Sequence, residues 1–483
     1  MRWYLEEYYR WPVGLFRERA ERDEQQFPEW GKALFAASLG QPVCREPLVA
    51  WQQIRGETER RFSVQVDAST LETGADAQAN ANEAATRLQS LPWELLHDDA
   101  YLSDGANPVR IRRHLPNFKQ QPPSITELPI RILLLSPRPE EPGVGYIDHR
   151  ASALPLVQAV ESLGDLVQLT VLSPPTLAAL EQELHRARDA QTPYDVLHFD
   201  GHGVYDKQHG LGALCFEHPN DTDRLEARRN ELVHADKLAK LLKDFRIPLV
   251  FLEACQSAQA EADPNASVAA SLLEEGVTSV VAMSHSVLVE TARRFVTAFY
   301  QALAQGQRVG AAMLAGQKTL MRNTYRLPMS GAGDLHLQDW FVPILYQEQH
   351  DPQLFAWLPS ATAQNMQARQ QQTRLGWLPE PPEHTFIGRS RELLKAERLL
   401  EQPFGSAQGT GYVVIRGQGG AGKTTLAVEL ARWLVRSRRF DRCAFVSVEQ
   451  YTHDRAVVEV LLQQLVNPKH NLAAEYGNDI DQA

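Results

Sequence analysis

Cysteine is scarce in this sequence. Only four occur in 483 residues, at positions 44, 215, 255 and 443, and none belongs to a CxxC pair. That scarcity excludes a disulfide framework and a zinc site of the paired-cysteine type. It is typical of a reducing cytosol, where a single cysteine is either a small core residue or a nucleophile. The cysteines therefore predict a cytoplasmic protein.

Long apolar runs, a positive charge excess and internal repeats are also lacking. The longest apolar runs, Ile247–Leu252 and Val277–Met283, are strand-sized, and a membrane-spanning helix needs about 18 residues. The N-terminus turns acidic at Glu6 and Glu7, where a signal peptide would be apolar. A net charge of −11 argues against a broad nucleic-acid surface. We therefore expect neither a membrane nor a nucleic acid as partner.

What is present is the composition of a globular protein, with 43% hydrophobic and 23% charged residues. From residue 129 onward, short continuous apolar runs alternate with helix-length amphipathic segments. Such alternation predicts a parallel sheet covered on both faces. We expect a doubly wound, mostly parallel α/β fold over 126–348, with an α+β part over 1–125 before it. A glutamine- and proline-rich stretch predicts a linker at 349–384, and a further unit follows at 385–483.

Two of the predicted strands run into reactive side chains. The run 194–199 continues into Gly201-His202-Gly203, and the run 248–254 stops at Cys255. Sites form outside the carboxyl ends of parallel strands, so these residues meet if the strands are neighbours. An adjacent imidazole raises the thiolate fraction of a thiol and protonates a leaving amine. The pattern predicts Cys255 as nucleophile, His202 as acid and base, and the Gly203 N–H as an oxyanion donor.

Two other interpretations of these residues stay open. A cysteine that closes an apolar strand is usually inert packing, and a single histidine usually makes an ordinary hydrogen bond. His198, His202 and Cys255 are also suitable zinc ligands. The two histidines, however, are four apart on a strand and turn and do not share a helical face. The spacing therefore favours the dyad.

The segments His198–Gly203 and Leu252–Cys255 resemble the CHAT family of caspase-like, clan CD cysteine peptidases, relatives of separase. The histidine comes first and the two reactive positions are 53 residues apart, close to the caspase spacing. Further similarity lies at Arg2–Glu6, Pro92–Leu96 and Trp340–Tyr346. The resemblance covers about residues 1–348. It implies a caspase-like fold, a protein or peptide substrate, no cofactor for the peptidase, and the N–H groups of Gly203 and Cys255 as oxyanion donors.

The sequence departs from caspases at several places near this site. It has Glu253 where caspases carry glutamine and Ser257 where they carry glycine, and His285 stands where many relatives have tryptophan. Specificity is therefore not transferable from the family. Candidates for a first substrate pocket are Asp200, Asp206, Glu253 and Ser284, each of which is also an ordinary surface or turn residue in the simplest interpretation.

A second motif lies near the C-terminus. Residues 417–424 fit GxxxxGK[ST] between a predicted strand at 411–416 and a predicted helix at 425–435. The glycines let backbone N–H groups converge on phosphate oxygens, Lys423 reaches the β- and γ-phosphates, and the Thr424 hydroxyl binds magnesium. The loop predicts ATP or ADP binding with magnesium, through these residues: Gly417, Gly419, Gly420, Gly422, Lys423, Thr424 and Thr425.

Upstream of the loop, Ile387-Gly388-Arg389 resembles the N-terminal motif of STAND-type signalling NTPases, which contacts adenine. A second strand is predicted at 443–448, and no apolar run ending in Asp-Asp follows it. We therefore expect the start of a P-loop NTPase module, without the acid that positions magnesium and water for hydrolysis.

Together these features predict a cytosolic, bacterial-type signalling or defence effector. It is a cysteine endopeptidase regulated by an attached ATP-binding NTPase that, by analogy with relatives, oligomerises on activation. Two alternatives remain open. One is a nucleotide-gated scaffold whose protease-like domain is only an interaction module; the other is a nucleotide hydrolase whose N-terminal domain docks partners. The presence of both His202 and Cys255 favours the peptidase.

Overall fold

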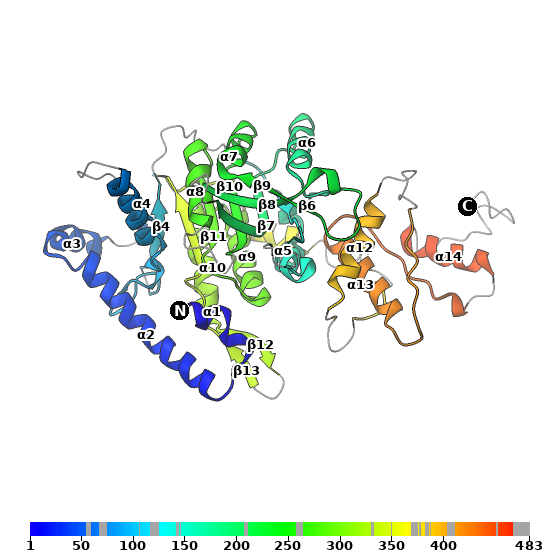
Figure 1. Ribbon diagram of the computed structural model, residues 1–483, viewed down its shortest axis with the longest axis horizontal. Coiled ribbons are helices and arrows are strands. Elements are labelled where there is room, and N and C mark those ends of the chain that lie inside the picture. Colours follow the sequence, from blue (N-terminus) through cyan, green and yellow to red (C-terminus); the bar gives the residue numbers. More distant parts are fainter. Residues whose placement is uncertain are drawn as a thin grey trace.

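The computed structural model describes residues 1–54, 59–66, 75–105, 107–115, 125–141, 144, 146–206, 211–256, 264–329, 333–348, 350–368, 375, 378–381, 386, 388–402, 411–450 and 453–466. Its centre is one large, mostly parallel sheet, in the strand order β1-β4-β14-β11-β10-β7-β5-β6 (Figure 1). The strands are β1 (Arg60–Val64), β4 (Val109–His114), β5 (Ile130–Leu135), β6 (Val167–Val171), β7 (Val196–Asp206), β10 (Leu249–Gln256), β11 (Ser279–Met283) and β14 (Pro343–Gln347). Within this path only the β11–β14 pair is antiparallel.

Helices cover both faces of the sheet, because side chains along each strand alternate between two cores. In β5, Ile130, Ile132 and Leu134 belong to one core, whereas Leu133 and Leu135 belong to the other. The first core is covered by α5 (His149–Leu163), α9 (Val289–Ala304) and α10 (Val309–Arg322); the second by α6 (Leu177–Asp189), α7 (Ala235–Asp244) and α8 (Pro264–Glu275). The predicted doubly wound α/β fold is confirmed.

The N-terminal part extends the sheet at its β1 edge. It contains α1 (Arg2–Glu6), α2 (Leu15–Ser38), α3 (Arg45–Gln53), α4 (Ala75–Ser90) and the small β2–β3 ladder (His97–Asp98, Ala100–Tyr101). Helix α2 projects along the outside of the molecule, opposite the C-terminal elements (Figure 1). Within the segment Pro92–Leu96, the buried Glu94 forms an ion pair with the buried Arg113 of β4.

Strand β7 is longer than its apolar run predicts. Its second half forms an antiparallel ladder with β8 (Leu211–Glu217), which in turn pairs with β9 (Asn230–His234). A separate hairpin, β12 (Tyr325–Met329) and β13 (Gly333–His336), lies near α1 (Figure 1). Sequence reasoning missed both strands: β8 contains the short apolar run Ala213–Phe216, which was overlooked, whereas β9 (Asn-Glu-Leu-Val-His) has only two apolar residues in a row.

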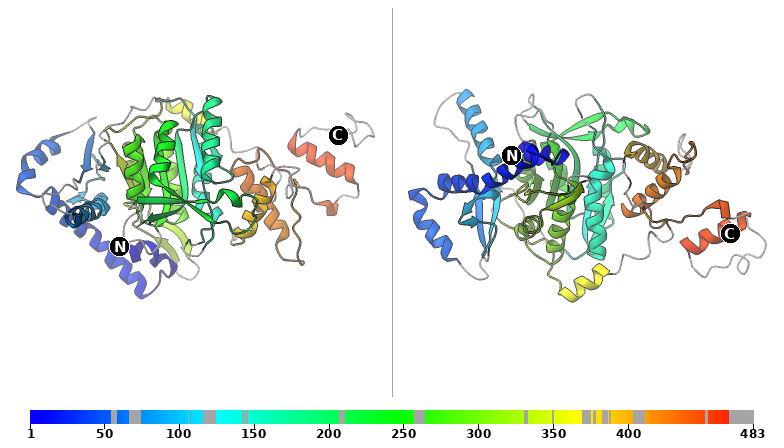
Figure 2. Two further views of the ribbon diagram at one scale, coloured as in Figure 1. Left: turned by 45° about the horizontal axis from the view of Figure 1, so that its top comes forward. Right: turned by 90° about the horizontal axis from the view of Figure 1, so that it is seen from below.

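The C-terminal unit consists of α12 (Ser390–Glu401), α13 (Lys423–Arg436) and α14 (Asp454–Leu465). Helices α12 and α13 pack on each other and lie beside α5, whereas α14 stands apart in all views (Figure 2). Part of the predicted linker is also helical, in α11 (Ser360–Ala368).

The two strands predicted in this unit, at 411–416 and 443–448, are wrong: residues 411–416 and 443–447 form no strand, and Val448 begins a short 3-10 helix. A strand exists only where a neighbour completes its ladder, and within the described residues neither segment has one. Tyr412 and Val414 are accordingly 64% and 61% exposed. Within the part of the chain that the structure describes, no helix is long and apolar enough to cross a membrane.

Candidate active site and phosphate loop

His202 and Cys255 occupy directly opposite positions on two neighbouring parallel strands. Their pairing belongs to the β7–β10 register, which runs from Val196 opposite Leu249 to Gly203 opposite Gln256. The sequence placed His202 in a glycine-flanked turn, and that detail is wrong. Strand β7 continues through His202 because residues 203–206 find a second partner in β8. The two strands are nevertheless neighbours in the sheet, as the sequence analysis requires for His202 and Cys255 to meet.

The glycines around His202 serve different needs. A Cβ at Gly201 would lie only 2.9 Å from the Phe199 ring and 3.3 Å from Pro137, so close packing requires glycine there. Gly203 is buried between Gln256 of β10 and Leu214 of β8. It thus lies inside the ladder and not in a turn. The role of its N–H as an oxyanion donor stays a prediction.

His198 lies on β7 four residues before His202. It is fully buried and has partners on both ring nitrogens. Its Nε2 lies 3.3 Å from a Glu253 carboxylate oxygen and its Nδ1 3.3 Å from the Tyr300 hydroxyl. The ring also stacks on Phe251, at 4.4 Å between centroids. Burial raises the pKa of Glu253, against the lowering effect of His198. The His198 ring therefore makes all of its described contacts inside the protein core.

The zinc interpretation includes Cys255, whose side chain lies outside the described part of the structure, so it stays untested. Among the side chains that the structure describes, no group of three or more His, Cys, Asp and Glu residues is arranged to hold a metal ion.

Asp200, two residues before His202, is a buried structural residue. Its carboxylate accepts hydrogen bonds from Ser136 (2.9 Å) and Ser152 and pairs with Arg138 at 2.5 Å. The simple interpretation as a surface or turn residue is wrong for Asp200, which is 1% exposed. It is also wrong for Glu253, which lies within β10 and contacts His198.

The other pocket candidates lie on strand ends. Asp206 is the last residue of β7. Ser284 follows β11, and its hydroxyl donates to the Val342 carbonyl at 2.9 Å. Beside it His285 is half-buried, with Nδ1 3.0 Å from the Ser284 hydroxyl, and burial lowers its pKa. Because β11 is the other neighbour of β10, His285 lies on the opposite side of β10 from His202.

The phosphate loop has an open backbone cradle. A Cβ at Gly419 or Gly420 would meet nothing within 4 Å, and Gly420 and Gly422 have φ of +76° and +74°. The loop leads directly into the N-terminus of α13, where backbone N–H groups point outward. Lys423 donates to the Gln418 carbonyl at 2.8 Å, so its ammonium already faces the loop. Thr424 and Thr425 follow in the first turn of α13. These residues fit the phosphates of a nucleotide.

The upstream motif touches this loop. Arg389 has a left-handed backbone (φ +57°), and its guanidinium donates to the Ala421 carbonyl at 2.9 Å. Gly388 precedes it with φ +76°. Ile387 lies outside the described residues. Arg389 of this motif is therefore adjacent to the phosphate loop, whereas contact of the motif with adenine stays a prediction.

The ion pairs that join the two units could not be predicted from the sequence, because their partners are far apart in the chain. Arg150 of α5 pairs with Glu429 of α13 at 3.2 Å, and Arg391 of α12 pairs with Glu140 at 3.0 Å. The buried pair Arg398–Glu217 is the most enclosed of the three.

Comparison with family models assigns both units. The CHAT domain model matches residues 83–364, more than half of the chain, and the NB-ARC domain model matches residues 395–479. The chain belongs to the CHAT-domain family, whose fold is caspase-like, and an NB-ARC P-loop domain follows the CHAT domain. An NB-ARC domain implies nucleotide binding.

Solved structures with similarity to the chain are clan CD cysteine peptidases. The separase of the Saccharomyces cerevisiae separase–securin complex has 16% identity and a TM-score of 0.30, over 55% of this chain and 15% of that one. The Arg-specific gingipain R has 11% identity and a TM-score of 0.34, over 70% and 76%. Caspase-1 from Spodoptera frugiperda has 11% identity and a TM-score of 0.26, over 50% and 93%. A comparison with curated proteins found no match.

Proposed function

We propose that this chain is a cysteine endopeptidase in which Cys255 is the nucleophile and His202 the acid and base. The observation that carries the proposal is their opposed placement on neighbouring parallel strands in a CHAT-family fold. The thiolate of Cys255 attacks the scissile carbonyl, and the oxyanion that forms is stabilised by backbone N–H groups, with Gly203 as a candidate donor.

The proton balance follows from the pair. His202 accepts the thiol proton and returns it to the leaving amine, which yields a thioester and the first product. It then takes a proton from water as the water attacks the thioester, and it passes this proton to the departing sulfur, which releases the second product and restores the thiol. No metal and no organic cofactor takes part in this scheme.

The other cysteines do not suit this role. Burial raises the pKa of Cys215 to about 12, so it stays a thiol at neutral pH. Cys44 donates to the Ser38 carbonyl in the N-terminal part, and burial raises the pKa of Cys443. A cysteine is reactive at neutral pH when the pKa of its thiol is lowered, because the thiolate is the nucleophile. A reactive cysteine in this chain is therefore expected at position 255.

The experiment uses a panel of fluorogenic peptides and a thiol-reactive peptide reagent. Wild type and Cys44→Ala should cleave and label alike, whereas Cys255→Ala and His202→Ala should lose turnover while melting at nearly the wild-type temperature. Because the two groups act as a unit, the two losses should be similar in size and not additive. Turnover that persists in folded Cys255→Ala would end the proposal and favour a scaffold role.

The NB-ARC unit is proposed to control this activity through ATP or ADP with magnesium. Gly417–Gly422 would cradle the phosphates, Lys423 would neutralise their charge, and the Thr424 hydroxyl would hold the magnesium ion. Protein substrates, and assembly into oligomers on activation, follow from the same family analogy. Light scattering with and without nucleotide tests the assembly.

A further inference from the structure

Strand β7 forks at the residues that precede His202. Residues 196–199 pair with β5, and residues 203–206 pair with β8. On that side of β7, positions 200–202 therefore lie between two diverging strands, while β10 pairs with them on the other side. A buried carbonyl that loses its strand partner needs another donor. His202 is the last residue within this fork.

Arg138 fills the fork. This 4% exposed residue follows β5, and its guanidinium donates to the Asp200 carbonyl at 2.7 Å while pairing with the Asp200 carboxylate at 2.5 Å. One side chain thus satisfies both the backbone and the side chain of the residue two positions before His202. On the side of β7 that faces away from β10, the Arg138 guanidinium therefore takes the place of strand-to-strand hydrogen bonds at Asp200.

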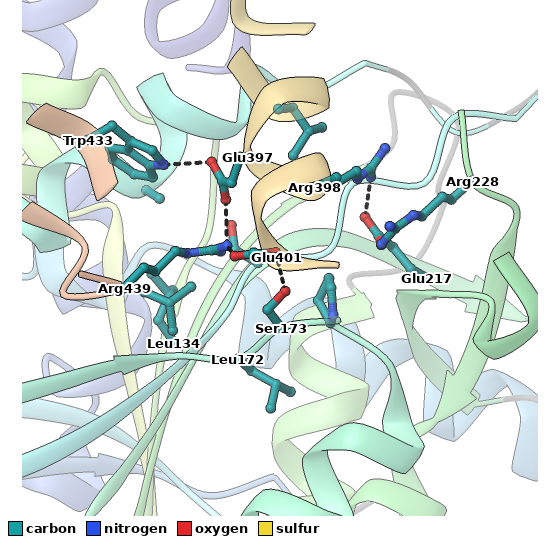
Figure 3. Close-up of a pocket in the computed structure, with 15 residues that line it drawn as sticks. Leu134, Leu172, Ser173, Glu217, Arg228, Glu397, Arg398, Glu401, Trp433 and Arg439 are labelled. Atoms are coloured by element: carbon teal, nitrogen blue, oxygen red, sulfur yellow. Dashed lines mark hydrogen bonds and ion pairs between the residues drawn. The ribbon is translucent and has the colours of Figure 1, made fainter. Parts of the chain in front are cut away.

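The fork is connected to the NB-ARC unit through Glu217, the last residue of β8. Figure 3 shows Glu217 beside Arg398 and Arg228. One of its oxygens accepts from the Arg138 backbone N–H at 3.1 Å and from Arg398 of α12 at 2.6 Å. The other oxygen accepts from Arg228 at 2.6 Å. A buried chain of contacts therefore runs from α12 through Glu217 and Arg138 to Asp200.

The charges indicate that Arg398 can leave without harm to the peptidase fold. Glu217 keeps Arg228, and Asp200 keeps Arg138, so each buried acid retains a cation of its own unit. Arg398 is the surplus cation, and burial lowers its pKa. Breaking a buried pair is costly mainly when one charge is left uncompensated. That penalty does not arise when α12 undocks.

We propose that Arg398 is a positioning residue for the candidate dyad, and that its docking on Glu217 fixes the Arg138-filled fork and thereby segment 200–202. This inference rests on the proposed peptidase function. Loss of Arg398 frees the Glu217 oxygen that it shares with the Arg138 N–H. The fork then loosens and His202 samples positions away from its place opposite Cys255.

The test compares Arg398→Ala with Lys395→Ala in the full chain. Lys395 lies one turn earlier on α12 and spans the same interface, but its pair with Glu226 is exposed (2.7 Å; 51% and 78%). We expect Arg398→Ala to lower kcat about tenfold or more, because small misplacement of a catalytic group is costly. KM should stay within about twofold, since substrate contacts are untouched. Lys395→Ala should match wild type, and Arg398→Lys should recover part of kcat.

A second measurement does not need turnover. Amide hydrogen exchange of segment 200–206 should be faster in Arg398→Ala than in Lys395→Ala, with equal exchange in β5 as evidence that the fold is intact. Equal exchange and equal kcat in the two variants overturn the inference. A third outcome separates this inference from the proposed function. If exchange is faster in Arg398→Ala but Cys255→Ala shows the same turnover as wild type, the effect of Arg398 on β7 is supported and the proposed peptidase function is contradicted. If Arg398→Ala fails to fold, Arg398→Met, which keeps the length of the side chain and removes only its charge and donors, replaces it with the same expectations.

Discussion

His198 and Glu253 face each other across β7 and β10, with 3.3 Å between Nε2 and a carboxylate oxygen. Glu253 comes two residues before Cys255 on the same strand, so a change in its charge occurs close to the candidate nucleophile. An anion near a thiol disfavours the thiolate and raises the thiol pKa. The buried pair therefore bears on the reactivity of Cys255.

Glu253→Gln should make the Cys255 thiol more acidic, since it removes this anion. The midpoint of the pH dependence of Cys255 alkylation should fall by up to about one pH unit. Mass spectrometry of the alkylated peptide separates Cys255 from the other cysteines. Glu181→Gln, on the exposed side of α6, is the matched control. A midpoint that rises or does not move in Glu253→Gln contradicts the expected repulsion.

Nucleotide binding should depend on Lys423. A ligand that binds only the folded state stabilises it by about 2.7 kcal/mol at a hundredfold excess over Kd, which appears as a thermal shift of several degrees. ATP and ADP should both give this shift in wild type and in Lys395→Ala, and neither should in Lys423→Ala. A full shift in Lys423→Ala would mean that the nucleotide binds elsewhere.

Stability should fall with rising pH through the titration of Asp195. Burial raises the pKa of Asp195 to about 6, although Arg131 N–H and Thr126 donate to it. Between about pH 4 and pH 6 the folded state therefore binds more protons than the unfolded state, whose aspartates ionise near 3.9. Stability decreases across that window by about 3 kcal/mol and is level above it.

The measurement is chemical denaturation of wild type, Asp195→Asn and Asp189→Asn at several pH values. Asp189 is exposed at the end of α6 and serves as control. The pH slope should shrink only in Asp195→Asn. Parallel curves for all three proteins would show that Asp195 ionises normally in the fold.

The pair Arg113–Glu94 should be the most sensitive ion pair of the N-terminal part. Both side chains are almost completely buried, and Arg113 also donates to the Leu91 carbonyl at 2.7 Å. Arg113→Met leaves Glu94 buried without a counter-charge, which costs about 3–5 kcal/mol. Arg87→Met removes the exposed pair with Glu83 and should cost at most about 1 kcal/mol. Similar melting temperatures for the two variants would be inconsistent with a buried, paired Glu94.

Continuous apolar runs were enough to predict the centre of the sheet. Strand β5 has the bounds that its sequence indicates, and β10 and the first half of β7 follow the same rule. The two reactive positions could be predicted because each closes such a run. The register of β7 and β10 is a consequence of packing between strands, so the sequence indicated only that His202 and Cys255 were compatible with neighbouring strands.

Other features of the structure have no periodic apolar pattern in the sequence and could not be predicted from it. Helix α2 was missed because it is mostly polar and contains Pro28, which normally argues against a helix interior. The fork at Asp200 depends on Arg138, Glu217 and Arg398, which are far apart in the chain. Side chains that meet only after folding have no local pattern to detect. The two strands expected around the phosphate loop show the reverse case, because their apolar pattern has no ladder partner among the residues that the structure describes.

Helix α12 and the Arg389 that precedes it touch both sites, through Arg389 at the Ala421 carbonyl and through Arg398 at Glu217. With 12 residues the helix is about 18 Å long, short enough to move as a rigid body. Thermodynamic reciprocity then applies to its docking: the factor by which nucleotide changes the docking equilibrium of α12 equals the factor by which docking changes nucleotide affinity. A substitution at the Glu217 end that undocks the helix, such as Arg398→Ala, would thus be measurable at the phosphate loop as a changed nucleotide affinity.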